Sequence, residues 1–152
     1  MAFKLVISDP KTGKSYQKEF EQTGILVGKK IGEKLSGEAF GLSGYELEIT
    51  GGSDKIGIPM RKDVEGATSR RLLLTKGIGY RAKFKIKKDG KIWYDSEPKG
   101  ARKKKRVRGN TIGTDNVQVN LIVVKHGAHP LDKIFPPKEK KEEAKTAEPA
   151  KA

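Results

Sequence analysis

The sequence predicts an all-β protein: a small barrel or sandwich of about six short strands with glycine-rich loops, a basic internal arm and a disordered C-terminal tail. Apolar and polar residues alternate with a period of two in several short segments, which is typical of half-buried strands. The 152 residues include 18 glycines and show no convincing helical period. A hydrophobic content of 34% supports one core rather than two. We expect the sheet to close on itself, because closure removes exposed edges.

The first strands are predicted around a short turn. Residues 3–8 (FKLVIS) and 15–20 (SYQKEF) flank DPKTGK, which places proline early and glycine late, and so predict a hairpin. Residues 45–50 (YELEIT) place Tyr45, Leu47 and Ile49 on one face, and we expect this strand to stop at Gly51 and Gly52. Residues 23–44, which lie between the hairpin and this strand, are rich in glycine and indicate turns with at most one helical turn.

Three later segments complete the predicted strands. Residues 70–75 (RRLLLT) indicate a short buried strand, and residues 116–125 (NVQVNLIVVK) alternate apolar and polar positions. Residues 80–95 alternate lysines with apolar residues before Asp89-Gly90, which predicts a basic-faced hairpin. The strand phases predict burial of Leu5, Ile7, Leu47, Ile49, Leu73, Val119 and Leu121.

The domain is expected to span residues 1–127 and to include the basic arm at 99–109. Residues 128–152 form a C-terminal extension. From residue 138 onward this extension has mixed charge, and apart from Pro149 its only apolar side chains are those of alanine. Such a segment has too little apolar surface to offset the entropy of ordering, so we expect disorder.

Positive charge is concentrated in one stretch of the chain. The net charge is +14, and residues 66–125 carry seventeen Lys and Arg against four Asp and Glu. Concentrated like charge destabilises a compact chain by self-repulsion, and a polyanionic partner relieves that repulsion. Nucleic acid is therefore the expected partner.

The densest charge lies in residues 99–108, KGARKKKRVR, where seven of ten residues are Lys or Arg. Such a run is also typical of a solvated loop or an import signal. Here, however, it lies between predicted strands, and Gly100 and Gly109 leave the backbone free to follow an irregular groove. Arginine forks grip phosphate or stack on bases. No recognition helix is available for duplex DNA, which favours folded RNA. The candidate RNA-binding residues are Lys99, Arg102, Lys103, Lys104, Lys105, Arg106, Arg108, Arg70, Arg71, Arg81, Lys55 and Arg61.

No catalytic or metal-binding constellation is found. The chain has no cysteine, which excludes disulfides, thiolate zinc sites and cysteine nucleophiles. His126 and His129 lack a third ligand and are expected to be an exposed loop pair. Residues 24–30 (GILVGKK) are one residue short of a phosphate loop and have Lys30 where Ser or Thr should hold magnesium. Asp54 is expected to be a turn residue that bonds its own backbone. We therefore expect no enzyme activity, no cofactor, no metal and no small-molecule substrate.

The chain is expected to be soluble and cytoplasmic. The N-terminus lacks the apolar run of a signal peptide, and no segment is long and apolar enough to span a membrane. No membrane partner is expected.

Two motifs carry a family resemblance. Residues 49–61 (ITGGSDKIGIPMR) resemble the signature of the small-subunit ribosomal protein S-six-e (S6e) family, Gly-Gly-x-Asp-x-x-Gly-x-Pro-Met. Residues 102–112 (RKKKRVRGNTI) resemble its second hallmark, a basic run that closes on Val-Arg-Gly. The motifs occur in the family's order, and the resemblance covers roughly residues 3–127.

The resemblance implies a β-barrel protein of the small ribosomal subunit, of the short archaeal type, in contact with ribosomal RNA and neighbouring ribosomal proteins. It implies a signature turn formed by Gly51, Gly52, Asp54, Gly57, Pro59 and Met60, and an RNA arm formed by residues 102–106 and 108. Ile58 replaces the family's usual Phe, and residues 82–100 are longer than the usual link. No serine follows Ser96, so the phosphorylatable serines of eukaryotic members have no counterpart.

The predicted function is a structural constituent of the small ribosomal subunit that binds ribosomal RNA through its Lys/Arg-rich arm during translation. The alternative is a chromatin-like or RNA-chaperone protein that binds nucleic acid loosely. An RNA-modifying enzyme ranks third, because active-site residues are lacking.

Overall fold

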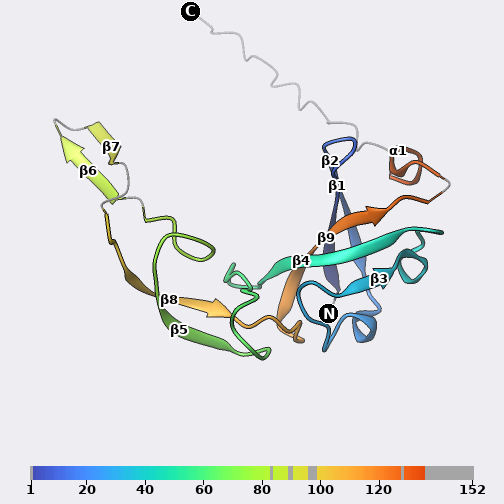
Figure 1. Ribbon diagram of the computed structural model, residues 1–152, viewed down its shortest axis with the longest axis horizontal. Helices are drawn as coiled ribbons and strands as arrows, with labels where there is room; N and C mark the ends of the chain where they lie inside the picture. The colour runs from blue at the N-terminus through green and yellow to red at the C-terminus, as the bar shows by residue number, and fades with distance from the viewer. Residues whose placement is uncertain (1, 83, 89–90, 96–98, 128, 136–152) are drawn as a thin grey trace, which may run out of the picture.

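The computed structural model describes residues 2–82, 84–88, 91–95, 99–127 and 129–135. Its main element is a five-stranded sheet of order β2-β1-β9-β4-β3, and two separate two-stranded units pair β5 with β8 and β6 with β7 (Figure 1). The strands of the sheet are β1 (Phe3–Asp9), β2 (Lys14–Phe20), β3 (Lys34–Ser36), β4 (Glu46–Asp54) and β9 (Asn116–Lys125). The smaller units contain β5 (Ser69–Leu74), β8 (Lys103–Arg108), β6 (Phe84–Lys88) and β7 (Lys91–Asp95).

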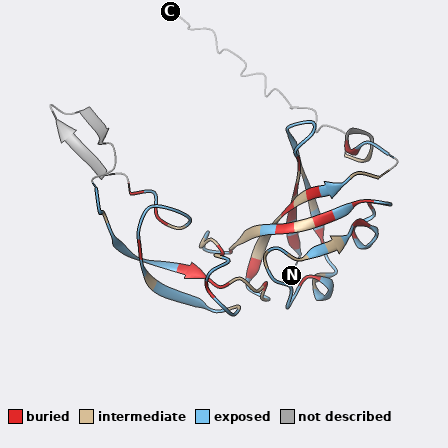
Figure 2. Ribbon diagram, in the orientation of Figure 1, coloured by how far each residue is buried: buried red, intermediate tan, exposed pale blue. Residues whose placement is uncertain are grey.

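The core of the five-stranded sheet follows the predicted alternation. β1 and β2 form the predicted antiparallel hairpin, and β1 pairs in parallel with β9, so that Leu5 lies opposite Val119 and Ile7 opposite Leu121. Figure 2 shows buried positions recurring along these strands. The predicted burial is confirmed for Leu5, Ile7, Leu47, Ile49, Val119 and Leu121.

The mainly β class is confirmed, but the closed barrel is not formed. β2 and β3 end the sheet on opposite sides, and within the described residues they do not pair with each other. The segments at 70–75 and 103–108 pair with one another instead of joining this sheet. β5 and β8 therefore form a separate unit, and the five-stranded sheet is open.

β4 continues past the point where the sequence suggested it would stop. It pairs with β9 through Gly51 and Gly52 to Asp54, with register shifts after Ile49 and Ser53. A Cβ atom at Gly52 would collide with the carbonyl oxygen of Gln118 on β9. Glycine therefore permits the close approach of the two backbones rather than ending the strand.

The strand predicted at residues 70–75 is confirmed as β5, but the predicted burial of Leu73 is wrong. Leu73 is 57% exposed, whereas Leu74 is 6% exposed. β5 belongs to a two-stranded unit with a core on one face only, formed by Val64, Leu74, Tyr80, Ala82 and Val107. Leu73 points to the opposite face, because neighbouring side chains on a strand alternate.

The remaining segments add short elements. Residues 23–44 contain two 3-10 helices, Thr23–Ile25 and Gly37–Phe40, and also β3, which was not predicted. β6 and β7 form the predicted hairpin, but the side chains of 83–98 lie outside the described residues. The short helix α1 (Leu131–Ile134) buries Leu131, so ordered structure continues past residue 127. Residues 136–152 lie outside the described residues, so the disordered tail stays a prediction. Of the helices that the structure describes, none is long and apolar enough to cross a membrane.

Candidate nucleic-acid interface

The core of the basic arm is a regular strand. Residues 103–108 form β8 and pair antiparallel with β5 along its whole length, from Ser69 opposite Arg108 to Leu74 opposite Lys103. We call this two-stranded unit the β5–β8 ribbon. The expectation of an arm that follows an irregular groove is therefore wrong, because backbone hydrogen bonds to β5 hold the segment straight.

The open face of the ribbon carries cations without acidic partners on either strand. Arg71 lies directly opposite Arg106, and Leu73 lies opposite Lys104. All four side chains are exposed, and neither strand contains Asp or Glu. Like charges directly opposite each other on paired strands are destabilising. This face therefore favours an anion that can lie between the two arginines.

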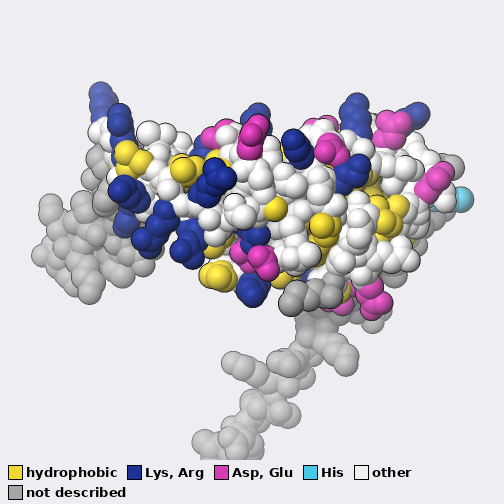
Figure 3. Space-filling view, turned by 90° about the horizontal axis from the view of Figure 1, so that it is seen from below, with side chains coloured by type: hydrophobic (Ala, Val, Ile, Leu, Met, Phe, Trp, Pro, Cys, Tyr) yellow, Lys and Arg dark blue, Asp and Glu magenta, His cyan; other side chains and the backbone are white. Residues whose placement is uncertain are grey.

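Further cations surround this face. Arg70, Lys103 and Lys105 are exposed at the margin of the ribbon's other face, beside the small core. Figure 3 shows Lys and Arg side chains gathered at the ribbon end of the molecule. The structure also places four other candidates on the surface, namely Lys55, Arg81, Lys99 and Arg102.

Arg61 is less available than these candidates. Its Nε and NH2 atoms donate to the two carboxylate oxygens of Asp63 at 2.8 and 2.6 Å, and its NH1 atom donates to the carbonyl of Ile78 at 2.9 Å. The bond to Asp63 raises the pKa of Arg61, and the bond from Arg61 lowers the pKa of Asp63. An RNA phosphate would have to compete with this partner.

Arg108 is not a surface cation. It is 5% exposed, and its NH1 atom donates to Oδ2 of Asp54 at 2.5 Å. Its NH2 atom donates to the carbonyl of Ala67 at 2.8 Å and lies 3.4 Å from the carboxylate of Asp115. The structure thus directs this guanidinium into the protein, contrary to its place among the predicted RNA contacts.

The signature turn meets the basic arm at this ion pair. The amide of Arg108 donates to the carbonyl of Pro59 at 2.9 Å, and the amide of Arg61 donates to the carbonyl of Arg108 at 3.0 Å. The amide of Gly57 closes the turn onto the carbonyl of Asp54 at 2.8 Å. Oδ2 of Asp54 accepts from Arg108, and Oδ1 makes no hydrogen bond within the described part of the chain, so the side chain pairs with Arg108 rather than with its own backbone. The sequence held one signal for this ion pair, namely that the first motif contains the acidic residue Asp54 and the second contains Arg108.

Met60 anchors the turn in the core. It is buried, its amide donates to the carbonyl of Gly52 at 3.0 Å, and its sulfur contacts the side-chain nitrogen of Asn116 at 3.0 Å. The turn therefore connects β4, β9 and the end of β8.

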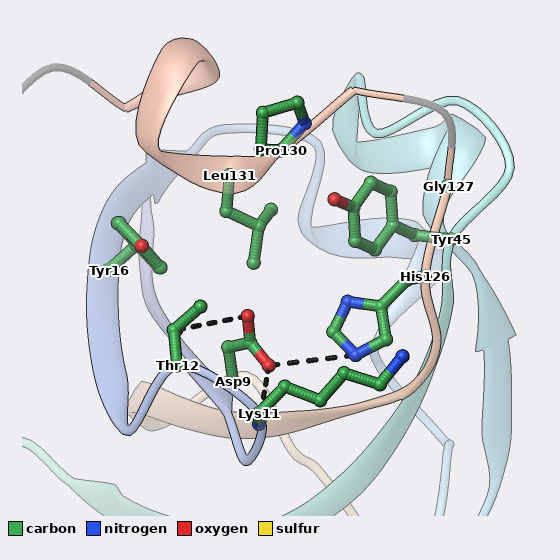
Figure 4. Close-up of a pocket in the computed structure, with 9 residues that line it drawn as sticks. All are labelled: Asp9, Lys11, Thr12, Tyr16, Tyr45, His126, Gly127, Pro130 and Leu131. Carbon is green, nitrogen blue, oxygen red and sulfur yellow. Dashed lines mark hydrogen bonds and ion pairs between the residues drawn. The ribbon is translucent and has the colours of Figure 1, made fainter.

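A second polar cluster lies at the other end of the sheet, in a cavity of about 320 Å³ (Figure 4). Buried Asp9 accepts hydrogen bonds from the amide of Lys11 at 2.9 Å and the hydroxyl of Thr12 at 3.0 Å, and its Oδ1 lies 3.6 Å from Nε2 of His126. Burial raises the pKa of Asp9, but the hydrogen bonds and the nearby His126 together lower it by more, so the net shift of this pKa is downward. These bonds fix the β1–β2 turn against the end of β9.

The two histidines do not act as a pair. His129 is exposed, as expected, whereas His126 is partly buried beside Asp9. The hydroxyl of Tyr45 donates to the carbonyl of His129 at 2.6 Å, and burial raises the pKa of Tyr45. Among the described residues no group of His, Asp and Glu is arranged to hold a metal ion. This cluster ties the C-terminal segment to the sheet.

Comparisons with known proteins match the part of the chain that contains both motifs. A family model described as ribosomal protein S6e matches residues 3–136. The small ribosomal subunit protein eS6 of Archaeoglobus fulgidus is 48% identical over 142 residues, which cover 91% of this chain and 99% of the relative. The protein of the same name from Methanococcus maripaludis is 50% identical over 131 residues, covering 86% and 94%. That of Nanoarchaeum equitans is 45% identical over 132 residues, covering 87% and 88%.

Proposed function

This chain belongs to the ribosomal protein S6e family, and we propose that it is a constituent of the small ribosomal subunit that binds ribosomal RNA through the β5–β8 ribbon. The family is one of structural proteins and not of enzymes. The curated relatives are named as proteins of the small subunit, and the matches span most of both chains. The proposed partners are small-subunit ribosomal RNA and neighbouring ribosomal proteins, in the ribosomes of the cytoplasm.

The observation that carries RNA binding is the exposed pair of Arg71 and Arg106. Two guanidinium groups opposite each other on an open face, with no acidic residue on either strand, repel each other until an anion lies between them. A phosphate accepts paired hydrogen bonds from an arginine fork. The lysines that flank this pair on β8 add point charges along the backbone of the RNA.

The two structural units then have separate roles. The five-stranded sheet supplies the core, and the ribbon presents cations away from that core. Five of the six arm residues inferred from the resemblance are exposed and are proposed RNA contacts: Arg102, Lys103, Lys104, Lys105 and Arg106. Arg108, the sixth, is buried and is not a proposed RNA contact.

Sedimentation tests the proposed function. Cell extract is separated on a sucrose gradient, and the small-subunit fraction is washed at high salt. A ribosomal constituent stays with the subunit in stoichiometric amount. A loosely binding chromatin-like or RNA-chaperone protein is released by the wash, because its affinity depends mainly on displaced counterions. Release of this chain would refute the proposal.

A further inference from the structure

We propose that the buried ion pair between Asp54 and Arg108 is a clasp that fixes the direction of the β5–β8 ribbon on the five-stranded sheet. In this role Asp54 and Arg108 are positioning residues that do not touch RNA. The inference rests on the proposed function, because it concerns how the RNA-binding face is held.

The position of the pair is the first argument. Asp54 is the last residue of β4, and Arg108 is the last residue of β8. The ion pair therefore joins the end of a core strand to the end of the ribbon. Backbone hydrogen bonds from Arg108 to Pro59 and from Arg61 to Arg108 surround it on both sides. Beyond this junction the ribbon extends away from the sheet (Figure 1).

The burial of the pair is the second argument. Asp54 is 8% exposed, and Arg108 is 5% exposed. Within the part of the chain that the structure describes, Oδ1 of Asp54 and Nε of Arg108 are buried and make no hydrogen bond. Each charge therefore depends on the other, since removal of one partner leaves an uncompensated charge in a poorly solvated place. A buried ion pair is weak evidence of added stability, but in some proteins such a pair specifies one arrangement of the elements that carry it, and this is the role that the clasp assigns to Asp54 and Arg108.

The length of the ribbon is the third argument. Six residues of a strand span about 20 Å, so a small change of angle at Arg108 moves Lys103 by several ångströms. The phosphates of folded RNA have fixed positions. If the ribbon takes several directions, only the molecules with the correct direction can bind. The apparent affinity is then the intrinsic affinity multiplied by the fraction of such molecules.

The substitution Asp54→Asn separates the clasp from simple electrostatics. It adds one unit of positive charge, so charge alone predicts tighter RNA binding. The clasp predicts weaker binding, because Arg108 loses its buried carboxylate partner and keeps only the carbonyl of Ala67 and the exposed carboxylate of Asp115. Asp115→Asn is the matched control. It adds the same charge beside the same guanidinium, but Asp115 is 62% exposed, and the bond to Asp54 remains.

The probe is small-subunit ribosomal RNA transcribed in vitro, titrated at several salt concentrations. For Asp54→Asn we expect a loss of affinity of about tenfold, as if the ribbon were correctly placed in a tenth of the molecules. The dependence of log affinity on log salt should stay unchanged, since no phosphate contact is removed. Arg108→Gln should weaken binding equally and also leave the slope unchanged. If Arg108 were a phosphate contact, its removal would lower the slope by about 0.7 to 0.9.

Hydrogen exchange shows whether the effect is local. In folded Asp54→Asn, the amides of β5 and β8 should lose protection, while those of β1 and β9 keep it. If the single variants do not fold, the double variant Asp54→Asn/Arg108→Gln tests the clasp instead, because it leaves no buried charge without a partner. It should fold and still bind RNA less tightly than the parent. Parental or tighter affinity in any folded variant of the pair would overturn the clasp.

A failure of the clasp can be distinguished from a failure of the proposed function. The variant Arg71→Ser with Arg106→Ser removes cations from the open face and leaves Asp54 and Arg108 in place. Parental affinity in that variant would refute RNA binding by the ribbon. Weakened binding in that variant, together with unchanged binding by Asp54→Asn, would overturn the clasp alone.

Discussion

Arg71 and Arg106 lie directly opposite each other across the two strands of the β5–β8 ribbon, and both are exposed. Backbone pairing between β5 and β8 brings the two like charges together, so the free protein carries an unfavourable interaction on this face. A bound phosphate would convert that interaction into a favourable one. The free energy of unfolding and the affinity for RNA therefore respond in opposite directions to changes at this pair.

Arg106→Glu should make the free protein more stable and its RNA binding weaker. The new carboxylate faces Arg71, and an opposite-charge pair across two strands contributes about 0.2–1 kcal/mol. The same carboxylate repels phosphate. Urea unfolding and RNA titration on the same sample measure both effects. Arg106→Gln is the control, and it should show a smaller change in each. Affinity equal to that of the parent would contradict the role given to this face.

The strand phases predict unequal costs for truncating buried and exposed apolar residues. Ile49 is fully buried in the sheet, so Ile49→Ala should lower the free energy of unfolding by about 2–5 kcal/mol. Leu73→Ala should change it by less than about 0.5 kcal/mol, because that side chain is mostly exposed. Urea denaturation measures both values. A large cost at Leu73 would show that the ribbon's open face is covered in the free protein.

A side chain at Gly109 should destabilise the protein. A Cβ atom there would collide with the carbonyl oxygen of Gly66, which packs against the end of the ribbon. Gly109→Ala should therefore cost about 1–3 kcal/mol in thermal or urea unfolding. Gly51→Ala is the matched control within the signature turn, because a Cβ atom there meets nothing within 4 Å. Equal costs at the two positions would contradict the close packing at Gly109.

The Asp9 cluster should make stability depend on pH in the acid range. The pKa of Asp9 in the folded protein lies below its ordinary value of 3.8, so its ionised form stabilises the fold at neutral pH. This contribution is lost as the pH falls through the lowered pKa. Asp9→Asn should therefore be less stable than the parent at neutral pH, and the difference should shrink in acid. Urea unfolding at a series of pH values measures it. A difference that is constant with pH would contradict the assignment.

The sequence predicted the five-stranded sheet better than the ribbon, for a physical reason. β1, β4 and β9 each bury one face in a large core, so their apolar residues alternate visibly. β8 buries only Val107 and Arg108, so no alternation marks it as a strand. β5 contains three consecutive leucines, and this run does not show which of them face the core and which face outward.

The sequence predicted which residues carry the positive charge of the candidate site, but not how they are arranged. The exposed cations of the arm are those the charge pattern indicated. The pairing of Arg108 with Asp54 could not be read from local sequence, because the two residues lie 54 positions apart and the contact depends on how two motifs fold together.

The exposed cations of the basic arm are the proposed main RNA contacts. The arm variant replaces five of them with serine: Arg102, Lys103, Lys104, Lys105 and Arg106. The sheet variant makes the same change in net charge at five exposed lysines of the other unit: Lys4, Lys11, Lys29, Lys30 and Lys34. A third variant replaces three lysines of the rival β6–β7 hairpin region with serine: Lys83, Lys85 and Lys87.

Parallel salt titrations of the three variants on small-subunit ribosomal RNA decide the question. Each phosphate contact removed should lower the slope of log affinity against log salt by about 0.7 to 0.9. The arm variant should show the greatest loss of both affinity and slope while its unfolding transition stays close to that of the parent. If the hairpin or sheet variant loses more affinity and slope than the arm variant, the ribbon is not the principal RNA contact.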